Sequence, residues 1–473
     1  MARLTFENLW VDGRWRSDVT VELDSTRQFS LAEDDRSTVE EGSEYIRGLT
    51  LPGLASAHCH AFQHLLAPWT QRSHGESDSF WTWRNAMYSA ASCMGPVELE
   101  AVAARCYLDL LKGGYTGVAE FLYLHRVGPR TDAPNADQAI VAAAKRVGLS
   151  LTLLPALYQH SHFGRRPATV AQQPFARSTA LFLEDWAELK RRYDANPSVT
   201  LGIAFHSLRA VDIETIMTVR DAVSVDEACR ALHIHVAEQP AEVADCMASF
   251  GRPPIDLLLD RGLLDPKWTL VHGTHATEAE LEGLCDRGAT LAVCPTTEAD
   301  LGDGCLNAAP EFFRRGGRLS IGSDSNVCCN AYRELRLLEW SQRLLHRRRN
   351  VLASPCEPFV ADALYRRTLA GGWGSLGRLD RESPQALPQS FVTYDDDAGN
   401  WRDQPSENYL SALVFGTGEL KARHVIAQGR WLIRDGAHRD EKQIERQYRA
   451  ALSSIRPQLI KALRPLNQNG DSC

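Results

Sequence analysis

Histidine and acidic residues recur in this chain where a metal ion could be bound. The stretch 49–64, LTLPGLASAHCHAFQH, places His58 and His60 two residues apart. On an extended strand, side chains at i and i+2 point to the same face, so both imidazoles can reach one point. Two neutral imidazoles converging at a strand end suit a divalent metal, most often zinc. A His-x-His motif alone has a high false-positive rate, so the interpretation depends on the rest of the chain.

Further candidates follow predicted strands downstream. LHIHVAEQ gives His235 and, three residues later, Glu238; TLVHGTH gives His272, and LSIGSDSN gives Asp324. In a barrel of alternating strands and helices, catalytic groups come from the carboxyl ends of different strands, so these side chains are expected to meet. A third imidazole and a carboxylate from this set would complete a site that holds one metal and leaves a position for water.

Two other histidines are alternatives at the fifth and sixth strands. His233 lies two residues before His235 on the same strand face, deeper in the barrel, and therefore ranks lower as a ligand. His275 lies just beyond the sixth strand. Cys59, between the first two histidines, is expected to point to the opposite face, into the core.

The chain between residues 49 and 380 alternates strand-like and helix-like segments. The candidate strands are 49–57, 116–121, 150–157, 200–205, 232–237, 268–272, 289–293 and 318–322. Segments with a 3.6-residue apolar period lie between them. Eight such alternations favour an α/β fold of the (β/α)8 TIM-barrel type over a doubly wound sheet. No Gly-x-Gly-x-x-Gly opens a helix after a strand, which weakens a dinucleotide-binding interpretation.

The two ends of the chain contain short β-like pieces. Residues 1–48 are too few to bury a core of their own and need a partner. The segment 381–473 offers candidate strands at 390–394, 412–415 and 424–433, the last with a hairpin signal at Gln428-Gly429. We therefore expect one small β-sandwich-like domain built from 1–48 and 381–473, with a closing helix near 441–463, beside a (β/α)8 barrel over 49–380.

Composition narrows the function classes. A net charge of −8 argues against a general nucleic-acid-binding surface. No apolar run reaches the ~20 residues of a membrane span, and the first residues lack the apolar core of a signal peptide. The 12 cysteines are scattered without paired spacing. We therefore expect a cytoplasmic protein with mostly free thiols, no membrane contact and no nucleic-acid partner.

The strand-end residues resemble those of the amidohydrolase superfamily in its mononuclear form. Within it, longer stretches resemble the formimidoylglutamate deiminases of histidine degradation. The matching pieces are HCHAFQ (58–63), DSFWTWRNAMY (78–88), GGYTGVAEFLYLH (113–125), HSLRAV (206–211), HIHVAEQ (233–239), VHGTH (271–275), CPTTEADLGDG (294–304) and GSDSN (322–326). Cys59, Asp300 and Asn326 depart from the usual pattern, and none of them removes a metal ligand.

The resemblance implies a metal site and a reaction. One divalent ion per chain, with zinc favoured, would be held by His58, His60, His235 and Asp324. Asp324 would take the proton of the metal-bound water as hydroxide attacks the formimino carbon of N-formimino-L-glutamate. Glu238 would handle the proton of the substrate nitrogen, and His272 would orient the water. The products would be N-formyl-L-glutamate and ammonia, and the family suggests a homodimer.

The resemblance also implies a set of substrate-binding residues: Gln63, Arg84, Tyr123, His206 and Arg209. A glutamate-like ligand brings two carboxylates, which arginine binds through two parallel hydrogen bonds. Two alternatives remain. One is a related deaminase acting on a guanine- or adenosine-type base, against which two pocket arginines argue. The other is a barrel that has lost catalysis and only binds a ligand.

Overall fold

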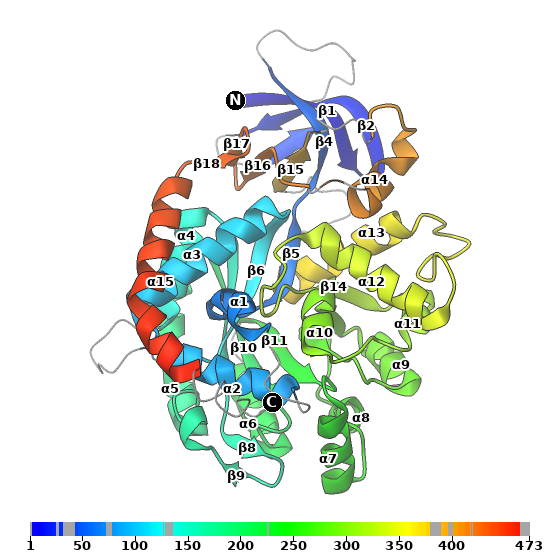
Figure 1. The fold of residues 1–473 in the computed structure, drawn as a ribbon. Coiled ribbons are helices and arrows are strands. Elements are labelled where there is room, and N and C mark those ends of the chain that lie inside the picture. Colours follow the sequence, from blue (N-terminus) through cyan, green and yellow to red (C-terminus); the bar gives the residue numbers. More distant parts are fainter. Residues whose placement is uncertain are drawn as a thin grey trace, which may run out of the picture.

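A barrel and a smaller β-domain make up the chain (Figure 1). The computed structural model describes residues 2–24, 28–31, 43–71, 78–125, 127, 136–224, 227–378, 389–395, 401–416, 418 and 420–463. Strand β4 (Glu44–Pro52) of the small domain leads directly into β5 (Leu54–Cys59), the first barrel strand, which runs away from that domain. Because the barrel strands are parallel, their carboxyl ends lie on the side far from the small domain.

Eight parallel strands form the barrel, and their order in the sheet follows their order in the chain. They are β5 (Leu54–Cys59), β6 (Tyr115–Leu122), β7 (Ser150–Leu157), β10 (Val199–Ser207), β11 (Cys229–Val236), β12 (Trp268–His272), β13 (Thr290–Val293) and β14 (Arg318–Ile321). Most of their residues are buried, as expected for parallel strands covered by helices. The predicted (β/α)8 barrel is confirmed.

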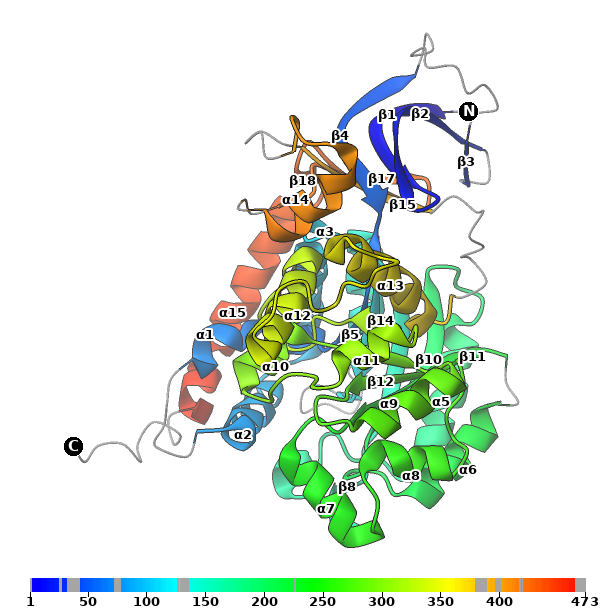
Figure 2. The ribbon, with the colours of Figure 1, turned by 90° about the vertical axis from the view of Figure 1, so that its right-hand side faces the viewer.

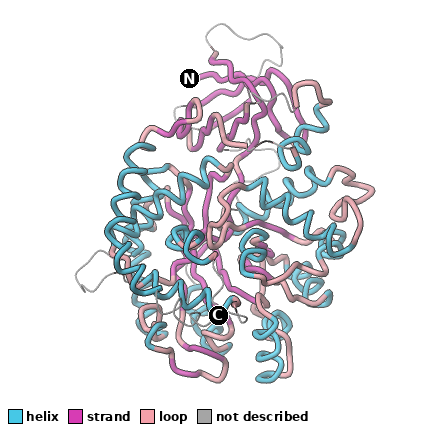
Figure 3. The backbone as a smooth tube through the Cα atoms, in the orientation of Figure 1, coloured by secondary structure: helices cyan, strands magenta, loops and turns pink. Residues whose placement is uncertain are grey.

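Helices surround the strands (Figure 3). Those of the barrel are α1 (Ala67–Thr70), α2 (Phe80–Ala91), α3 (Pro96–Lys112), α4 (Ala136–Val147), α5 (Thr179–Tyr193), α6 (Ile213–Ser224), α7 (Pro240–Phe250), α8 (Pro254–Asp260), α9 (Glu278–Arg287), α10 (Pro295–Leu301), α11 (Ala309–Arg314), α12 (Ala331–His346) and α13 (Val360–Ser375). A 3-10 turn, η1 (Ala61–Leu65), directly follows β5. A small hairpin, β8 (His160–His162) with β9 (Arg166–Pro167), extends the connection after β7.

The barrel closes where the first strand meets the eighth. The amide of Ser323 donates to the carbonyl of His58 at 2.9 Å, and the amide of His60 donates to the carbonyl of Asp324 at 3.0 Å. Helix α13 covers this seam, and a Cβ on its Gly371 would lie 2.0 Å from the carbonyl oxygen of Leu319. Glycine is therefore needed for the helix to approach the strands this closely.

The small domain is one sheet of eight strands in the order β18-β17-β16-β15-β4-β1-β2-β3. These strands are β1 (Ala2–Val11), β2 (Arg14–Leu23), β3 (Phe29–Leu31), β4 (Glu44–Pro52), β15 (Ser390–Tyr394), β16 (His424–Ala427), β17 (Arg430–Arg434) and β18 (Ala437–His438). The ring centroids of Phe29 on β3 and Phe391 on β15 are only 5.0 Å apart, although three strands separate them in the sheet order. The sheet therefore rolls over on itself to enclose a core, as the side view in Figure 2 illustrates.

Two expectations about these elements are wrong. Residues 49–52, expected in the first barrel strand, belong to β4, where Leu51 pairs with Val392 of β15. The segment 412–415, expected as a strand, lies in helix α14 (Tyr409–Phe415). We therefore propose a domain boundary at Gly53 in place of residue 48. The expected boundary after residue 380 lies outside the described residues.

Other terminal features agree with expectation. The hairpin between β16 and β17 turns through Gln428 and Gly429, whose φ values of 51° and 64° are those of a tight hairpin turn. The closing helix α15 spans Glu441–Leu463 and packs along α3. All cysteines in the described part of the chain are free. Among the helices that the structure describes, none combines the length and apolarity needed to cross a bilayer.

Candidate active site

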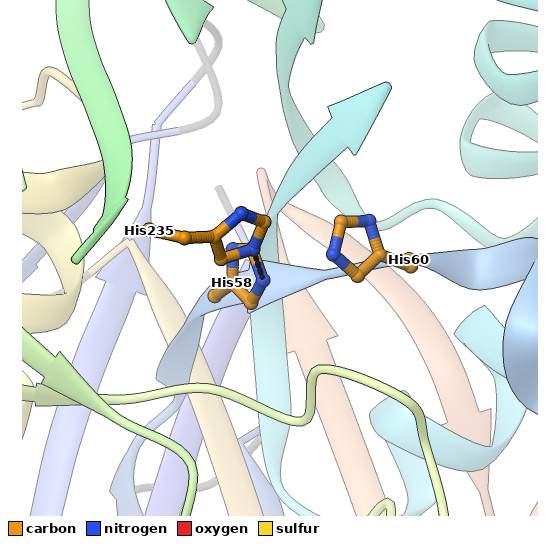
Figure 4. A group of neighbouring side chains, drawn as sticks. All are labelled: His58, His60 and His235. Carbon is orange, nitrogen blue, oxygen red and sulfur yellow. Dashed lines mark hydrogen bonds between the residues drawn. The ribbon is translucent and has the colours of Figure 1, made fainter. Parts of the chain in front are cut away.

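Three imidazoles converge at the carboxyl ends of β5 and β11. His58, His60 and His235 are all buried, and each offers a nitrogen within 4.8 Å of the others (Figure 4). The Nε2 atoms of His58 and His235 are 3.0 Å apart. The ring planes of His58 stand nearly perpendicular to those of His60 and of His235, both at 86°. The structure therefore brings together three histidines that the sequence proposes as metal ligands.

The hydrogen bonds of these rings leave lone pairs for a cation. Nδ1 of His60 lies 2.9 Å from the carbonyl oxygen of Phe121, and Nδ1 of His235 lies 2.8 Å from that of His206. A carbonyl accepts only from a protonated Nδ1, so the Nε2 atoms of both rings are unprotonated. Metal-bound histidines are oriented by such bonds. The donor set therefore fits a divalent metal ion.

Asp324, which follows β14, adds a carboxylate to the same cluster. Its Oδ1 lies 3.3 Å from Nε2 of His58 and 3.5 Å from Nε2 of His60, and its Oδ2 lies 3.9 Å from Nε2 of His272. Although burial opposes it, these neighbouring imidazoles lower the pKa of Asp324. The carboxylate is thus kept ionised, as a metal ligand or proton acceptor requires.

Glu238 and His272 lie beside the cluster. Oε1 of Glu238 is 3.6 Å from Nε2 of His272. Burial raises the pKa of Glu238 to about 7. The adjacent carboxylates of Glu238, Glu298 and Asp324 outweigh burial and raise the pKa of His272 to about 10. A carboxyl group with a pKa near neutrality can both give and take a proton, so Glu238 is suited to acid–base catalysis.

Backbone strain accompanies this geometry. Ala237, His272 and Asp324 adopt φ values of 51°, 73° and 43°, a left-handed region that L-residues rarely occupy. His272 is the last residue of β12, and Ala237 and Asp324 follow the ends of β11 and β14. Strain of this kind costs about 1–3 kcal/mol per residue and persists where the surrounding structure holds a functional geometry. The strained residues thus include two of the proposed catalytic residues.

Both candidate arginines stack on one indole ring. The guanidinium carbon of Arg84 lies 4.5 Å from the ring centroid of Trp81, and that of Arg209 lies 5.6 Å from it. Arg209 is buried, and its Nη2 atom is 3.9 Å from Oε2 of Glu238. The Nε atoms of both arginines are buried without a hydrogen-bond partner. Both arginines therefore have an unused donor, and Arg209 lies next to the proposed catalytic carboxylate.

The other proposed substrate-binding residues, Gln63, Tyr123 and His206, lie beside the histidine cluster. Tyr123 accepts a hydrogen bond of 2.8 Å from Nε2 of Gln63, whose Oε1 is buried without a partner. The Tyr123 ring lies 4.9 Å from that of His60 and 5.6 Å from that of His206. Burial, followed by the charge of Arg209, lowers the pKa of His206 well below its usual value. His206 is thus kept neutral beside the cluster.

The alternative histidines bond elsewhere. Nε2 of His233 lies 2.8 Å from the carbonyl oxygen of Ser375, and burial lowers the pKa of His233 to about 3. Nε2 of His275 lies 2.9 Å from the carbonyl oxygen of Asp303. Both rings therefore have structural partners away from the cluster.

Two of the three departures from the family pattern contact each other. The thiol of Cys59 lies 3.5 Å from Oδ1 of Asn326, behind the ligands. The Nδ2 atom of Asn326 donates to the carbonyls of His60 and Asp324, both at 2.9 Å. Asp300 lies apart from them and accepts a hydrogen bond from Gln71. Asn326 therefore ties the two backbone segments that carry ligands.

Sequence reasoning missed two residues of this site. Trp81 lies on helix α2 and contacts both guanidinium groups, a role that its place in the stretch DSFWTWRNAMY did not indicate. Glu298 on α10 lies 3.3 Å from Nδ1 of His272. Glu298 belongs to the stretch CPTTEADLGDG, whose apolar and acidic pattern gave no sign of a histidine partner.

Comparisons with known proteins agree with this geometry. Residues 49–359 match the amidohydrolase family. The formimidoylglutamate deiminase of Pseudomonas aeruginosa is 36% identical over 458 residues, which cover 96% of this chain and 100% of that protein. The chain belongs to the amidohydrolase family.

Solved structures of similar fold include two that bear on the site. An amidohydrolase from Brucella melitensis superposes with a TM-score of 0.88 at 34% identity, over 96% of this chain and 100% of that one. An adenosine deaminase from Xanthomonas campestris with bound zinc superposes with a TM-score of 0.79 at 21% identity, over 96% and 98% of the two chains. Amidohydrolases of this fold bind a metal, consistent with the convergent imidazoles described here.

Proposed function

We propose that this amidohydrolase is a formimidoylglutamate deiminase: it hydrolyses N-formimino-L-glutamate to N-formyl-L-glutamate and ammonia, a step of histidine degradation. The observation that carries the proposal is the pair Arg84 and Arg209, stacked on Trp81 beside Glu238. Two guanidinium groups with unused donors suit a small ligand that carries two carboxylates. The deiminase from Pseudomonas aeruginosa, similar over its whole length, supports the same substrate.

The proposed metal ligands are His58, His60, His235 and Asp324. Three imidazoles and one carboxylate form a borderline-soft site for which zinc is the preferred ion, and we propose one such ion here. When bound, the ion would act as a Lewis acid that makes water a nucleophile near neutral pH. The unprotonated Nε2 atoms of His60 and His235 support this ligand set.

The chain's own groups divide the proton transfers. Asp324, kept ionised by its imidazole neighbours, accepts the proton that the attacking water loses. His272, which lies between Glu238 and Asp324, orients that water. Glu238, with a pKa raised by burial to about 7, delivers a proton to the substrate nitrogen.

Which nitrogen leaves depends on which one is protonated. If the arginines hold the glutamate part, the terminal imino nitrogen faces Glu238. Protonation there makes ammonia the leaving group, while the substituted nitrogen stays attached to carbon. Oε2 of Glu238 lies 3.9 Å from Nη2 of Arg209, so the proton donor lies next to the arginine proposed to bind a substrate carboxylate.

Proton NMR of the reaction mixture tests the proposal directly. We expect the formyl signal of an amide together with one equivalent of ammonia. Formamide and glutamate as main products would contradict deimination, even with the metal site correct. A parallel panel with guanine- and adenosine-type bases tests the main alternative, which places a neutral purine against two cations. No turnover of any amidine or base by metal-loaded protein would favour a non-catalytic barrel.

We also propose a homodimer, which the family resemblance suggests, and a cytoplasmic location. The outer side of α12 exposes Trp340, Leu344 and Leu345, and Leu344 is 80% exposed. This helix is the first place to look for a subunit contact. Sedimentation velocity of the full chain measures the assembly state.

A further inference from the structure

A second group of metal-binding side chains lies outside the active site. His64 of η1, Cys106 of α3 and Cys329, which lies between β14 and α12, each offer a ligand atom within 4.8 Å of the other two. Cys106 is buried, and the other two are partly exposed. None of these three residues has a part in the proposed reaction.

The imidazole of His64 is oriented as in many protein metal sites. Its Nε2 lies 3.2 Å from Oδ2 of Asp109, which is also held by Nε of Arg105 at 2.8 Å. Its Nδ1 is buried without a hydrogen-bond partner. A carboxylate on one ring nitrogen fixes the ring and raises the basicity of the other, a common arrangement around zinc-bound histidine. The nitrogen left for the thiols is therefore Nδ1.

The two sulfur atoms lie where one metal ion could bind both as thiolates. The sulfurs of Cys106 and Cys329 lie within 4.8 Å of each other and of a ring nitrogen of His64. Two thiolates neutralise a divalent cation, so a soft ion can enter this mostly buried place without leaving an unpaired charge.

We propose that His64, Cys106 and Cys329 form a second metal site, selective for a thiophilic divalent cation such as zinc. This inference is independent of the proposed deiminase function and adds a second ion to the one in the active site. His64 follows the first barrel strand and Cys329 follows the eighth, while Cys106 belongs to the helix before β6. An ion at this place would link both edges of the barrel seam to α3.

Cobalt provides a probe that distinguishes the two sites, because the proposed active-site ligands include no sulfur. Protein stripped by a chelator and reloaded with Co2+ should show thiolate-to-cobalt charge-transfer absorption in the near ultraviolet. The band should persist in His58→Ala, which lacks an active-site ligand, and disappear in Cys106→Ser and Cys329→Ser. Zinc content should fall by one equivalent in each of the three variants.

Cys294→Ser is the matched control, because Cys294 is a buried thiol on the active-site side, grouped with His272 and Glu298. It should keep the band. Loss of the band only in Cys294→Ser, or no band in the parent protein, would overturn the proposal. A Cys106–Cys329 disulfide in freshly purified protein that binds no Co2+ after reduction would also overturn it. If either serine variant fails to fold, His64→Gln, read by the same band and by circular dichroism, replaces it.

Discussion

Nδ1 of His272 lies 3.3 Å from Oε1 of Glu298, and this contact fixes the ring whose Nε2 faces Glu238 and Asp324. The same Oε1 accepts a hydrogen bond of 2.8 Å from the amide of Cys294. Glu298 is thus anchored to the end of β13 and cannot swing away from His272. It acts as a positioning residue for the proposed water-orienting group.

Glu298→Gln should lower kcat by about one to two decades, the usual scale for losing a partner that orients an active-site histidine. The glutamine side-chain oxygen can still accept the hydrogen bond from the backbone amide of Cys294. It carries no negative charge, however, and so no longer stabilises a protonated His272. We expect metal content and KM to stay close to those of the parent protein and the pH profile of kcat to shift. A variant with unchanged kcat and an unshifted pH profile would show that Glu298 has only a structural role.

His58→Ala and Asp324→Ala should each lose one equivalent of metal, measured by elemental analysis of purified protein. Both side chains lie in the cluster where Oδ1 of Asp324 is 3.3 Å from Nε2 of His58. His275→Asn is the matched control, since its ring bonds to the carbonyl of Asp303 instead. Unchanged metal content in the two ligand variants would refute the ligand assignment.

Glu238→Gln separates chemistry from metal binding. The substitution keeps the shape but removes the proton, so kcat should fall by about 10²–10⁴, the range for a positioned acid–base group. Metal content should stay at the parent level. Turnover near that of the parent protein would remove Glu238 from the mechanism.

Arg209→Met should lower kcat/KM by about one to two decades, because a charge-assisted hydrogen bond contributes roughly 1.5–3 kcal/mol. The loss should be largest for substrates with both carboxylates. Trp81→Leu should weaken the binding of substrates that carry both carboxylates, since the indole supports Arg209 and Arg84 together. An equal loss on a formimino compound without the matching carboxylate would mean that Arg209 has another role.

Stability should depend on pH through Glu334 of α12. Burial raises its pKa from 4.5 to about 8, so the folded chain holds a proton that the unfolded chain releases. The contribution of Glu334 to the free energy of unfolding is fully present below pH 4.5 and is lost as the pH rises to about 8. In Glu334→Gln the side-chain oxygen can still accept the hydrogen bond that the Thr296 amide donates to Glu334 at 3.0 Å. The melting temperature of this variant should therefore fall less steeply over this interval, and parallel curves for variant and parent would contradict the prediction.

The barrel could be predicted because its strands are almost wholly apolar and alternate with helical periodicity. The domain boundary near residues 49–52 could not be predicted, because an apolar run carries no information about which of two sheets it joins. The prediction of a strand at 412–415 was wrong for a related reason. Its few apolar residues fit a buried strand or a short helix equally well, and only packing against α13 decides for α14.

The residues of the candidate site could likewise be predicted only in part. Side chains such as His58, His235 and Asp324 could be selected because parallel strands bring their carboxyl ends together. The partners of those side chains could not be selected. Trp81 reaches Arg209 from α2, and Glu298 reaches His272 from α10, so each contact depends on how a helix packs over the strand ends.

The seam between β5 and β14 also bears on synthesis of the protein. Barrel strands pair in chain order, so each can add to its predecessor as the chain leaves the ribosome. The contact between His58 and Asp324 is different, because the first strand must wait for the eighth. A nascent chain that ends before Asp324 carries two exposed strand edges and an incomplete ligand set. Binding of the proposed active-site ion should therefore follow translation of nearly the whole barrel.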